Sequence, residues 1–314
     1  MSRLSVVLPA YNEELMVGKT CRVLHEVLAE AGISYELVVV DDGSKDKTWE
    51  EITKAGEKDG NVLGVHFSRN FGKESAMMAG LENAGGDCVV VMDCDLQHPP
   101  ETIVEMYRLW QQGYEVVEGV KRTRGKENVF HKLSAGLFYK LISKAVKIDM
   151  SRASDFKLMD RRAVEALLAM PERNAFFRAL SSWIGFRTTS VEFDVQEREI
   201  GESKWSTKSL IRYAISNIVS FSSAPMTLVT ITGILGFLFA VILGIQTLVN
   251  YFSGHAVEGF TTVILIILIM GSLILMGLGV IGYYIAKIYE EVKCRPRYIV
   301  SRKVGAGMTW EKRR

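Results

Sequence analysis

Two carboxylates, Asp93 and Asp95, stand immediately after the apolar run of residues 89–92. A short valine-rich run is typical of a buried parallel strand, and open α/β sheets bind their ligands at the carboxyl ends of such strands. Two residues at this spacing in a loop can turn their oxygens toward one hard cation. A divalent metal held by one or two carboxylates keeps positions open for the oxygens of a diphosphate. The spacing therefore predicts a metal site that binds a diphosphate.

The carboxylate pair is a weak signal by itself, because Asp-x-Asp arises by chance about once in a chain of this length. Its position strengthens it. The pair lies between a predicted strand and the Pro99-Pro100 dipeptide, which is typical of a helix start. His98 is a further candidate ligand, but its place beside Pro99 favours a role in the helix start.

The elements that must position these carboxylates alternate along the chain. Strand-like apolar runs occupy residues 4–8, 36–40, 62–67 and 89–92, and helix-like stretches separate them. This alternation predicts an α/β fold with a mainly parallel, right-handed sheet covered by helices. Ser44 is expected to cap the helix that begins near Asp46. Trp110, Trp183 and the Phe176-Phe177 pair are expected in the core.

Two common nucleotide sites are missing from the sequence. No Gly-x-Gly-x-x-Gly follows the first predicted strand, and no Gly-x-x-x-x-Gly-Lys-[Ser/Thr] occurs anywhere. A nucleotide site built from carboxylates must instead use a metal for the phosphates and carboxylates for the base. Asp41 and Asp42 suit the second task, because a carboxylate accepts hydrogen bonds from the N–H groups of a pyrimidine or guanine.

The apolar residues, 48% of the chain, concentrate late in the sequence. After Arg212 the next formally charged residue is Glu258, and residues 259–286 carry no charge. Each run can hold the ~20 apolar residues that cross a bilayer core, which predicts spans near residues 226–251 and 260–286. Two buried helices of a soluble core are the alternative, which this length disfavours.

Lysine and arginine flank both runs but are missing from the connector at residues 252–259. By the positive-inside rule the protein is expected to be an integral membrane protein with both termini cytoplasmic. No secretory signal is expected, because the apolar run at residues 4–8 is too short. The four cysteines have no metal-ligand spacing and are expected to be free thiols: Cys21, Cys88, Cys94 and Cys294.

Four motifs follow one another along the first third of the chain: Pro9-Ala10-Tyr11-Asn12-Glu13, Asp41-Asp42-Gly43-Ser44, Arg69-Asn70-x-Gly72-Lys73 and Asp93-x-Asp95-x-Gln97. In order and spacing they resemble the metal-dependent, inverting glycosyltransferases of the GT-A fold. Among these the chain is most similar to the polyprenyl-phosphate sugar transferases related to dolichyl-phosphate mannose synthase and bactoprenol glucosyltransferase. The resemblance covers nearly all of residues 3–290. It implies a Rossmann-like sheet, then an interfacial amphipathic helix and a two-helix transmembrane hairpin.

The resemblance also implies roles for individual residues. The metal, Mg²⁺ or Mn²⁺, would be held by Asp93, Asp95 and Gln97. Asp155 looks like the acceptor-side carboxylate and would act in catalysis together with Asp95. The donor nucleotide would be bound by Pro9, Tyr11, Glu13, Asp41, Asp42, Lys73 and Asp93. The acceptor phosphate would be bound by Arg198, Ser203 and Lys204, with Arg122 and Arg124 as further candidates that could equally be solvated surface charges.

The expected acceptor fits the chemistry of the membrane surface. A lipid-linked phosphate cannot leave the bilayer interface, so its transferase needs a cationic pocket at headgroup depth. Residues 203–222 have the pattern of an interfacial helix, with Lys208 and Arg212 on its polar face. These two residues either bind the phosphate or form an ordinary positive flank of the first span.

Asp155 is not expected to be a general base. A sugar hydroxyl must lose a proton to attack an anomeric carbon, but a phosphate monoester has its second pKa at about 6 and is mainly a dianion at neutral pH. Asp155 would therefore orient the acceptor or the sugar and stabilise positive charge at the anomeric carbon. The larger catalytic task is to stabilise the negative charge that develops on the leaving nucleotide diphosphate.

The predicted organisation is a glycosyltransferase domain at 1–202, an interfacial segment at 203–224, a transmembrane hairpin at 225–288 and a basic tail at 289–314. The resemblance implies the transfer of one sugar, with UDP-glucose as the expected donor, to undecaprenyl phosphate at the cytoplasmic face of a bacterial inner membrane. The Gln-x-x-Arg-Trp box of processive synthases is absent, the nearest stretch being Arg178 to Trp183. UDP-N-acetylglucosamine and GDP-mannose stay open as donors, as does a catalytically idle homologue that binds nucleotide sugar. No nucleic-acid partner is expected.

The small residues Gly236, Ala240 and Gly244 lie four residues apart in the first apolar run, a spacing that lets helices approach closely in a membrane. They either close the hairpin within one chain or form the contact of a homo-oligomer.

Overall fold

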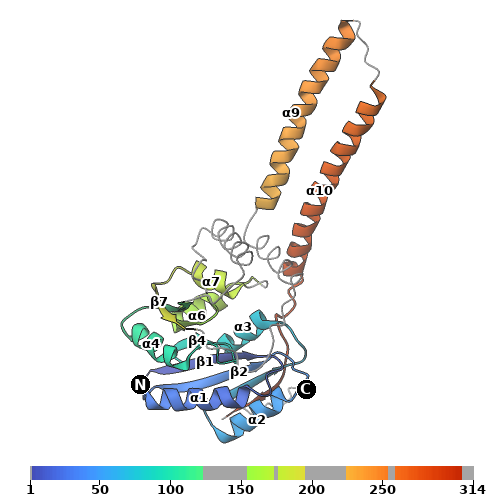
Figure 1. Cartoon of the computed structure of the whole chain (residues 1–314). Helices are drawn as coiled ribbons and strands as arrows, with labels where there is room; N and C mark the ends of the chain where they lie inside the picture. The colour runs from blue at the N-terminus through green and yellow to red at the C-terminus, as the bar shows by residue number, and fades with distance from the viewer. Residues whose placement is uncertain (1, 123–153, 173–175, 195–223, 254–258, 306–314) are drawn as a thin grey trace. The chain divides into compact units, whose positions relative to one another are not determined.

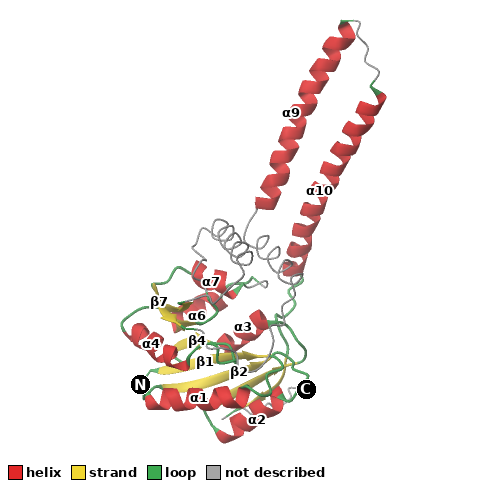
Figure 2. Ribbon diagram, in the orientation of Figure 1, coloured by secondary structure: helices red, strands yellow, loops and turns green. Residues whose placement is uncertain are grey.

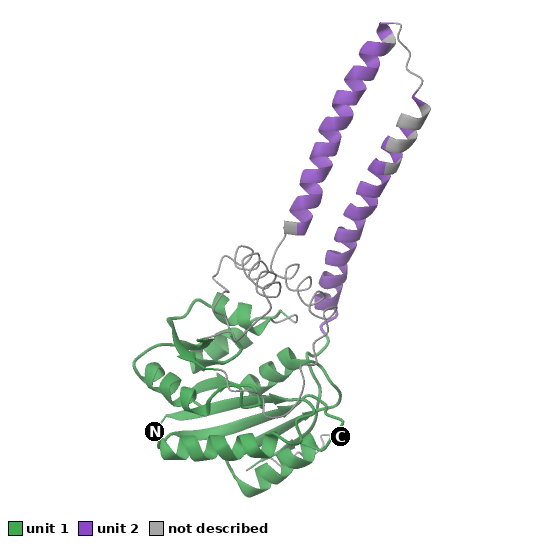
Figure 3. Ribbon diagram, viewed as in Figure 1, with its two compact units in different colours: residues 1–205, 295–314 green, residues 206–294 purple. Residues whose placement is uncertain are grey.

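The computed structural model describes residues 2–122, 154–172, 176–194, 224–253 and 259–305. The chain divides into two compact units (Figure 3). Residues Met1–Trp205 and Arg295–Arg314 form the first unit, and Ser206–Cys294 form the second. The first unit therefore contains residues that come before the second unit in the sequence and residues that come after it.

A sheet with the strand order β7-β5-β6-β4-β1-β2-β3-β8 forms the centre of the first unit (Figure 2). The first four strands of the sequence pair with one another in parallel: β1 (Arg3–Ala10), β2 (Ser34–Asp41), β3 (Val62–Phe67) and β4 (Cys88–Val91). The side chains of Val6, Leu37 and Val90 meet in register across β1, β2 and β4, and all three are fully buried. The predicted mainly parallel, helix-covered sheet is confirmed.

Three further strands, β6, β5 and β7, extend the sheet beyond β4. β6 (Lys157–Asp160) runs antiparallel to both β4 and β5 (Val116–Lys121), and β5 pairs in parallel with β7 (Thr188–Phe193). Val91 at the carboxyl end of β4 pairs with Lys157 at the amino end of β6. Asp93 follows the carboxyl end of β4, and Asp155 precedes the amino end of β6. Because these two strand ends are neighbours, the sheet places the two carboxylates close to each other.

Helices cover both faces of the sheet (Figure 1). The helix α1 (Val17–Glu30) buries Val17, Leu24 and Leu28 against the face that carries Val6, as the 3.6-residue period requires. On the other face Gly80 packs so closely that a Cβ there would lie 2.1 Å from Cγ1 of Val7. The other described helices of this unit are α2 (Thr48–Lys58), α3 (Lys73–Asn83), α4 (Pro100–Gln111), α6 (Arg161–Leu168) and α7 (Phe177–Trp183).

The start of α2 differs from the prediction. The N-cap residue is Lys47, which has no side-chain cap, and Oδ1 of Asp46, one residue earlier, accepts a hydrogen bond from the backbone N–H of Thr48 at 3.0 Å. The hydroxyl of Ser44 instead accepts from the backbone N–H of Asn12 at 2.8 Å. The expected cap by Ser44 is wrong, because this hydroxyl joins the loop after β2 to the loop after β1. The predicted helix start beside Pro99 is confirmed, since α4 begins at Pro100.

A last strand, β8 (Val300–Val304), pairs antiparallel with β3. It follows both long apolar helices in the sequence, yet it belongs to the first unit. The strand covers the edge of β3 that would otherwise expose its backbone groups.

The second unit contains two long apolar helices, α9 (Ala224–Phe252) and α10 (Phe260–Val292). The stretches Pro225–Asn250 and Ile269–Val292 are long and apolar enough to cross a membrane. Large side chains such as Phe237 and Leu275 are well exposed. Within this unit Gly236 faces Met270 of α10, since a Cβ at Gly236 would lie 3.9 Å from its Sδ. Residues 203–223, which hold the predicted interfacial helix, lie outside the described residues.

Candidate active site

The loop after β4 carries the predicted metal-binding residues. The side chain of Asp95 is buried, and its Oδ1 accepts from the backbone N–H of Gln97 at 3.2 Å. The carboxylate of Asp93 is 32% exposed, and its Oδ1 lies 2.6 Å from Nζ of Lys73. In the part of the chain that the structure describes, no three His, Cys, Asp or Glu side chains form a metal cluster. The protein therefore offers two carboxylates and the Gln97 amide at this loop.

This donor set fits a hard divalent cation. All three side chains present oxygen, which Mg²⁺ and Mn²⁺ prefer, and two carboxylates leave room for substrate oxygens. The ammonium of Lys73 against Asp93 shows that this carboxylate already accepts a cation as a neighbour. His98 stacks on Phe156 with ring centroids 4.5 Å apart, and its buried Nδ1 has no hydrogen-bond partner among the described residues. Burial lowers the pKa of His98, which favours the neutral ring.

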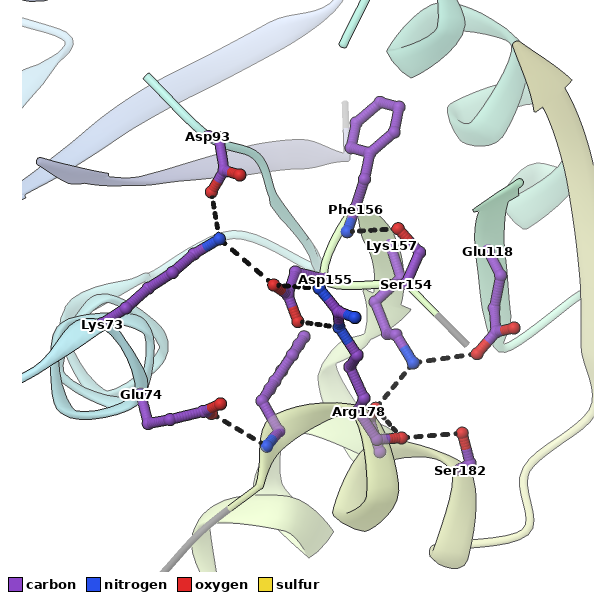
Figure 4. A network of polar contacts seen from close by, with 12 residues as sticks. Lys73, Glu74, Asp93, Glu118, Ser154, Asp155, Phe156, Lys157, Arg178 and Ser182 are labelled. Atoms are coloured by element: carbon purple, nitrogen blue, oxygen red, sulfur yellow. Dashed lines mark hydrogen bonds and ion pairs between the residues drawn. The ribbon is translucent and has the colours of Figure 1, made fainter. Parts of the chain in front are cut away.

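Asp155 lies between two cations (Figure 4). Its Oδ1 accepts from Nε of Arg178 at 2.7 Å, and its Oδ2 accepts from Nη2 of the same side chain at 2.9 Å. The ammonium of Lys73 lies 3.1 Å from Oδ2, so this lysine bridges Asp93 and Asp155. Burial alone would raise the pKa of Asp155, but Lys73 and Arg178 together hold it well below its usual range. Asp155 is therefore an anion at neutral pH.

Two further contacts fix the helix that carries Arg178. The backbone N–H of Phe177 donates to Oε2 of Glu74 at 2.9 Å. The fully buried ammonium of Lys157 donates to Glu118 at 2.8 Å and to the hydroxyl of Ser181 at 2.6 Å. Burial, followed by the charge of Asp155, raises the pKa of Glu74 to about 7. The helix α7 is thus held from α3 at its first residue, Phe177, and from β6 at Ser181 further along.

Sequence reasoning missed Arg178, Glu74, Glu118 and Lys157. Arg178 is 23 residues from Asp155, and no spacing rule connects two such positions. Glu74 stands beside Lys73 in a predicted motif, which was the one available signal.

The Asp41-Asp42 pair holds the loops around the predicted nucleotide site. Asp41 is fully buried and bonds inside the protein, to the backbone N–H of Ser44 at 2.9 Å and to Nδ1 of His66 at 2.7 Å. Asp42 accepts from the backbone N–H groups of Phe71 and Gly72 at 2.6 and 2.9 Å. Burial raises the pKa of Asp42 to about 6.

The glycine between these loops has a steric reason. Gly43 has φ +66°, and a Cβ there would lie 2.3 Å from the carbonyl carbon of Arg69. The loop after β2 and the loop after β3 therefore touch at Gly43. Any larger residue would push them apart.

The loop after β1 joins the same group. Pro9 lies in β1 opposite Val40, and Tyr11 is half-buried just beyond the strand. The backbone N–H of Glu13 donates to the Thr48 hydroxyl at 2.8 Å. The structure thus gathers the predicted donor-side residues at the carboxyl ends of β1 and β2, in the loops after these strands and β4, and at the start of α3.

Other predictions fall elsewhere. Arg122 is 59% exposed and pairs with Asp194 at 3.1 Å and Glu192 at 3.6 Å. The core prediction for Trp183 is wrong, because its side chain is 59% exposed at the end of α7. Arg124, Arg198, Ser203 and Lys204 lie outside the described residues.

The mainly parallel, helix-covered sheet has the GT-A architecture that is expected of a glycosyltransferase. Residues 5–168 match glycosyl transferase family 2, and the chain belongs to that family. A bactoprenol glucosyl transferase of Shigella phage SfII is 37% identical over 306 residues, which cover 96% of this chain and 98% of the relative. The uncharacterized glycosyltransferase YkcC of Bacillus subtilis is 40% identical over 306 residues, 96% of this chain and 94% of its own length.

A solved structure of glucosyl-3-phosphoglycerate synthase from Mycobacterium tuberculosis, in complex with Mn²⁺, UDP-glucose and phosphoglyceric acid, is also similar. It has a TM-score of 0.49 and 20% identity, and the match covers 70% of this chain and 79% of that one.

Proposed function

We propose that this protein transfers one sugar from a nucleotide-diphosphate donor, with UDP-glucose the expected donor, to undecaprenyl phosphate at the cytoplasmic face of the membrane, with inversion at the anomeric carbon. Relatives named bactoprenol glucosyl transferase support the acceptor and the sugar, because they are 37% identical over 95% or more of this chain. Their match includes the two apolar helices as well as the sheet.

The observation that carries the proposal is the position of Asp155 between Lys73 and Arg178. A hydroxyl acceptor needs a base that takes its proton, and a carboxylate with two bound cations and a lowered pKa is a poor base. A phosphate acceptor needs no base, because its dianion attacks directly. It does need cations nearby, and the guanidinium of Arg178 and the ammonium of Lys73 supply them.

On the donor side Asp93, Asp95 and Gln97 would hold Mg²⁺ or Mn²⁺. A divalent cation bound there would offset the negative charge that develops on the leaving diphosphate. Asp42, with Pro9, Tyr11 and Glu13, would contact the nucleoside. Asp41 would act by shaping its loop, since its oxygens already bond Ser44 and His66.

The order of the elements supports a topology in which the chain crosses the membrane twice. β8 comes after α10 and pairs with β3, which comes before α9. If both helices cross a bilayer, the two parts of the sheet must lie on one side of it. The lysine and arginine flanks favour the cytoplasmic side. The proposal therefore has a cytoplasmic domain at 1–202, whose sheet β8 of the basic tail completes, an interfacial helix at 203–224 and a hairpin at 225–288. The acceptor phosphate would be bound by Arg198, Ser203 and Lys204, with Arg122 and Arg124 as further candidates. A homo-oligomer through the α9 glycines stays a prediction.

A donor panel tests the proposal. The full-length protein in detergent is incubated with undecaprenyl phosphate, Mg²⁺ or Mn²⁺, and labelled UDP-glucose, UDP-N-acetylglucosamine or GDP-mannose, and butanol-extractable label is counted. We expect transfer from UDP-glucose, and none by Asp95→Ala under the same conditions. Transfer only from another donor would overturn the sugar assignment. Nucleotide binding without transfer from any donor would favour the idle homologue.

A further inference from the structure

Residues 297–304, which follow the second apolar helix in the sequence, contact the rest of the first unit at several points. β8 pairs with β3 along this segment. The hydroxyl of Ser301 donates to the carbonyl of His66 at 3.2 Å. Three longer side chains reach other elements: Arg297 bonds the carbonyls of Met170 and Glu172, Tyr298 bonds Glu82, and Lys303 bonds Asn83. The segment is thus attached to β3, to the end of α3 and to the chain beyond α6.

Tyr298 begins a line of aromatic contacts that ends at the donor site. Its ring stacks on Phe67 with centroids 4.8 Å apart and an interplanar angle of 15°. Phe67 meets the ring of Phe71 edge to face at 5.8 Å. The backbone N–H of Phe71 donates to Asp42 at 2.6 Å. Each residue in this line contacts the next.

The backbone supports the same connection. The N–H of Ser68 donates to the carbonyl of Ile299 at 3.0 Å. The loop at residues 68–72 is therefore held at its start by the segment after the second apolar helix. At its end it is held by Asp42, through Phe71 and Gly72.

We propose that Tyr298 is a positioning residue for the donor site: by packing on Phe67 it keeps the loop at residues 68–72 in the conformation in which Phe71 and Gly72 bond Asp42. The inference rests on the proposed function only in taking Asp42 as a residue of the nucleotide site. Its consequence is that donor binding depends on chain that lies beyond both apolar helices. The line Tyr298–Phe67–Phe71–Asp42 does not include Asp155 or Arg178 of the acceptor side.

Hydrogen exchange of the full-length protein in detergent tests the positioning without any ligand. In Tyr298→Leu the amides of Phe71 and Gly72 should exchange at least about 10-fold faster than in the wild type, because the loop loses its aromatic support. Tyr298→Phe keeps the stack and should stay near the wild type. Ile299→Ala is the matched control, since this neighbour's side chain is 53% exposed and its carbonyl bond is retained.

Kinetics with UDP-glucose and undecaprenyl phosphate give the second readout. Tyr298→Leu should raise the donor KM about 5–10-fold, the range expected from losing one aromatic pair, while the KM for the lipid stays within about twofold. Tyr298→Phe should restore the donor KM. Exchange at Phe71 and Gly72 that matches the wild type, or equal rises in both KM values, would overturn the inference.

Two controls keep the result decisive. If Tyr298→Leu loses protection throughout β1 and β4, Phe71→Leu replaces it, because it cuts the same line at the other end and leaves Tyr298 on Phe67. Faster exchange at Gly72 in that variant supports the inference, and unchanged exchange overturns it. If the wild type transfers no sugar, the proposed function fails, but the exchange result still decides the role of Tyr298.

Discussion

Replacing Asp155 with Asn removes its charge and keeps its size. In the wild type two guanidinium bonds of 2.7 and 2.9 Å and an ammonium at 3.1 Å meet this carboxylate. Charge-assisted hydrogen bonds contribute about 1.5–3 kcal/mol each, and an amide keeps one acceptor oxygen. Lys73 and Arg178 are also 41% and 31% exposed, so solvent screens part of the loss. These contacts exist before the reaction, so kcat falls only by the part of the loss that is felt in the transition state. A net loss of about 3 kcal/mol is the upper bound, which gives a fall in kcat of at most about 100- to 200-fold.

The pH dependence of kcat separates the possible roles of Asp155. Lys73 and Arg178 hold the pKa of Asp155 well below its usual range, so this carboxylate does not titrate between pH 5 and 8.5. The acceptor phosphate does titrate, with its second pKa at about 6. At saturating donor and lipid, kcat should fall below about pH 6 in the wild type, and the same acidic limb should persist in Asp155→Asn.

The assay measures kcat for wild type, Asp155→Asn and Glu74→Gln from pH 5 to 8.5. Glu74→Gln is the necessary control, because the pKa of Glu74 is raised to about 7 and could produce a limb of its own. The pKa of Asp42 is raised to about 6, so its titration could weaken donor binding in the same pH range. A saturating donor concentration keeps this effect out of kcat. If the acidic limb disappears in Asp155→Asn while activity remains measurable, Asp155 is a titrating base and the mechanism is wrong.

Two other predictions concern stability and topology. Burial raises the pKa of Glu74 from 4.5 to about 7, so the folded state binds the proton more tightly than the unfolded state, and stability should fall as pH rises through this window. Glu74→Gln should remove this loss, which at pH 8 amounts to at most about 3 kcal/mol, as thermal unfolding at pH 4 and pH 8 can measure. For topology, a cysteine at Ser253 should react with an impermeant maleimide from outside the cell, whereas one at Lys293 should not. The reverse pattern would exclude the cytoplasm-in hairpin.

The sequence predicted those parts of the molecule that depend on local patterns. The valine-rich strands and the polar motifs after them could be placed because period and turn chemistry act over a few residues. The pairing of β8 with β3 could not, since Ser301 and His66 are 235 residues apart. Arg178 and Asp155 meet only because β6 and α7 come together, and nothing in their spacing indicates it. Ser44 was assigned to the wrong partner for the same reason, because Asn12 competes for its hydroxyl from another loop.

The central claim is that the acceptor is a phosphate, bound near Asp155, Lys73 and Arg178, and that it attacks without a general base. The most direct measurement compares undecaprenyl phosphate with undecaprenol, which has the same lipid chain and a hydroxyl in place of the phosphate, as acceptors for labelled UDP-glucose. The account predicts labelled lipid with undecaprenyl phosphate and none with undecaprenol, at any pH from 6 to 9. Transfer to undecaprenol at a comparable rate, rising with pH, would contradict it, because the site would then activate a hydroxyl.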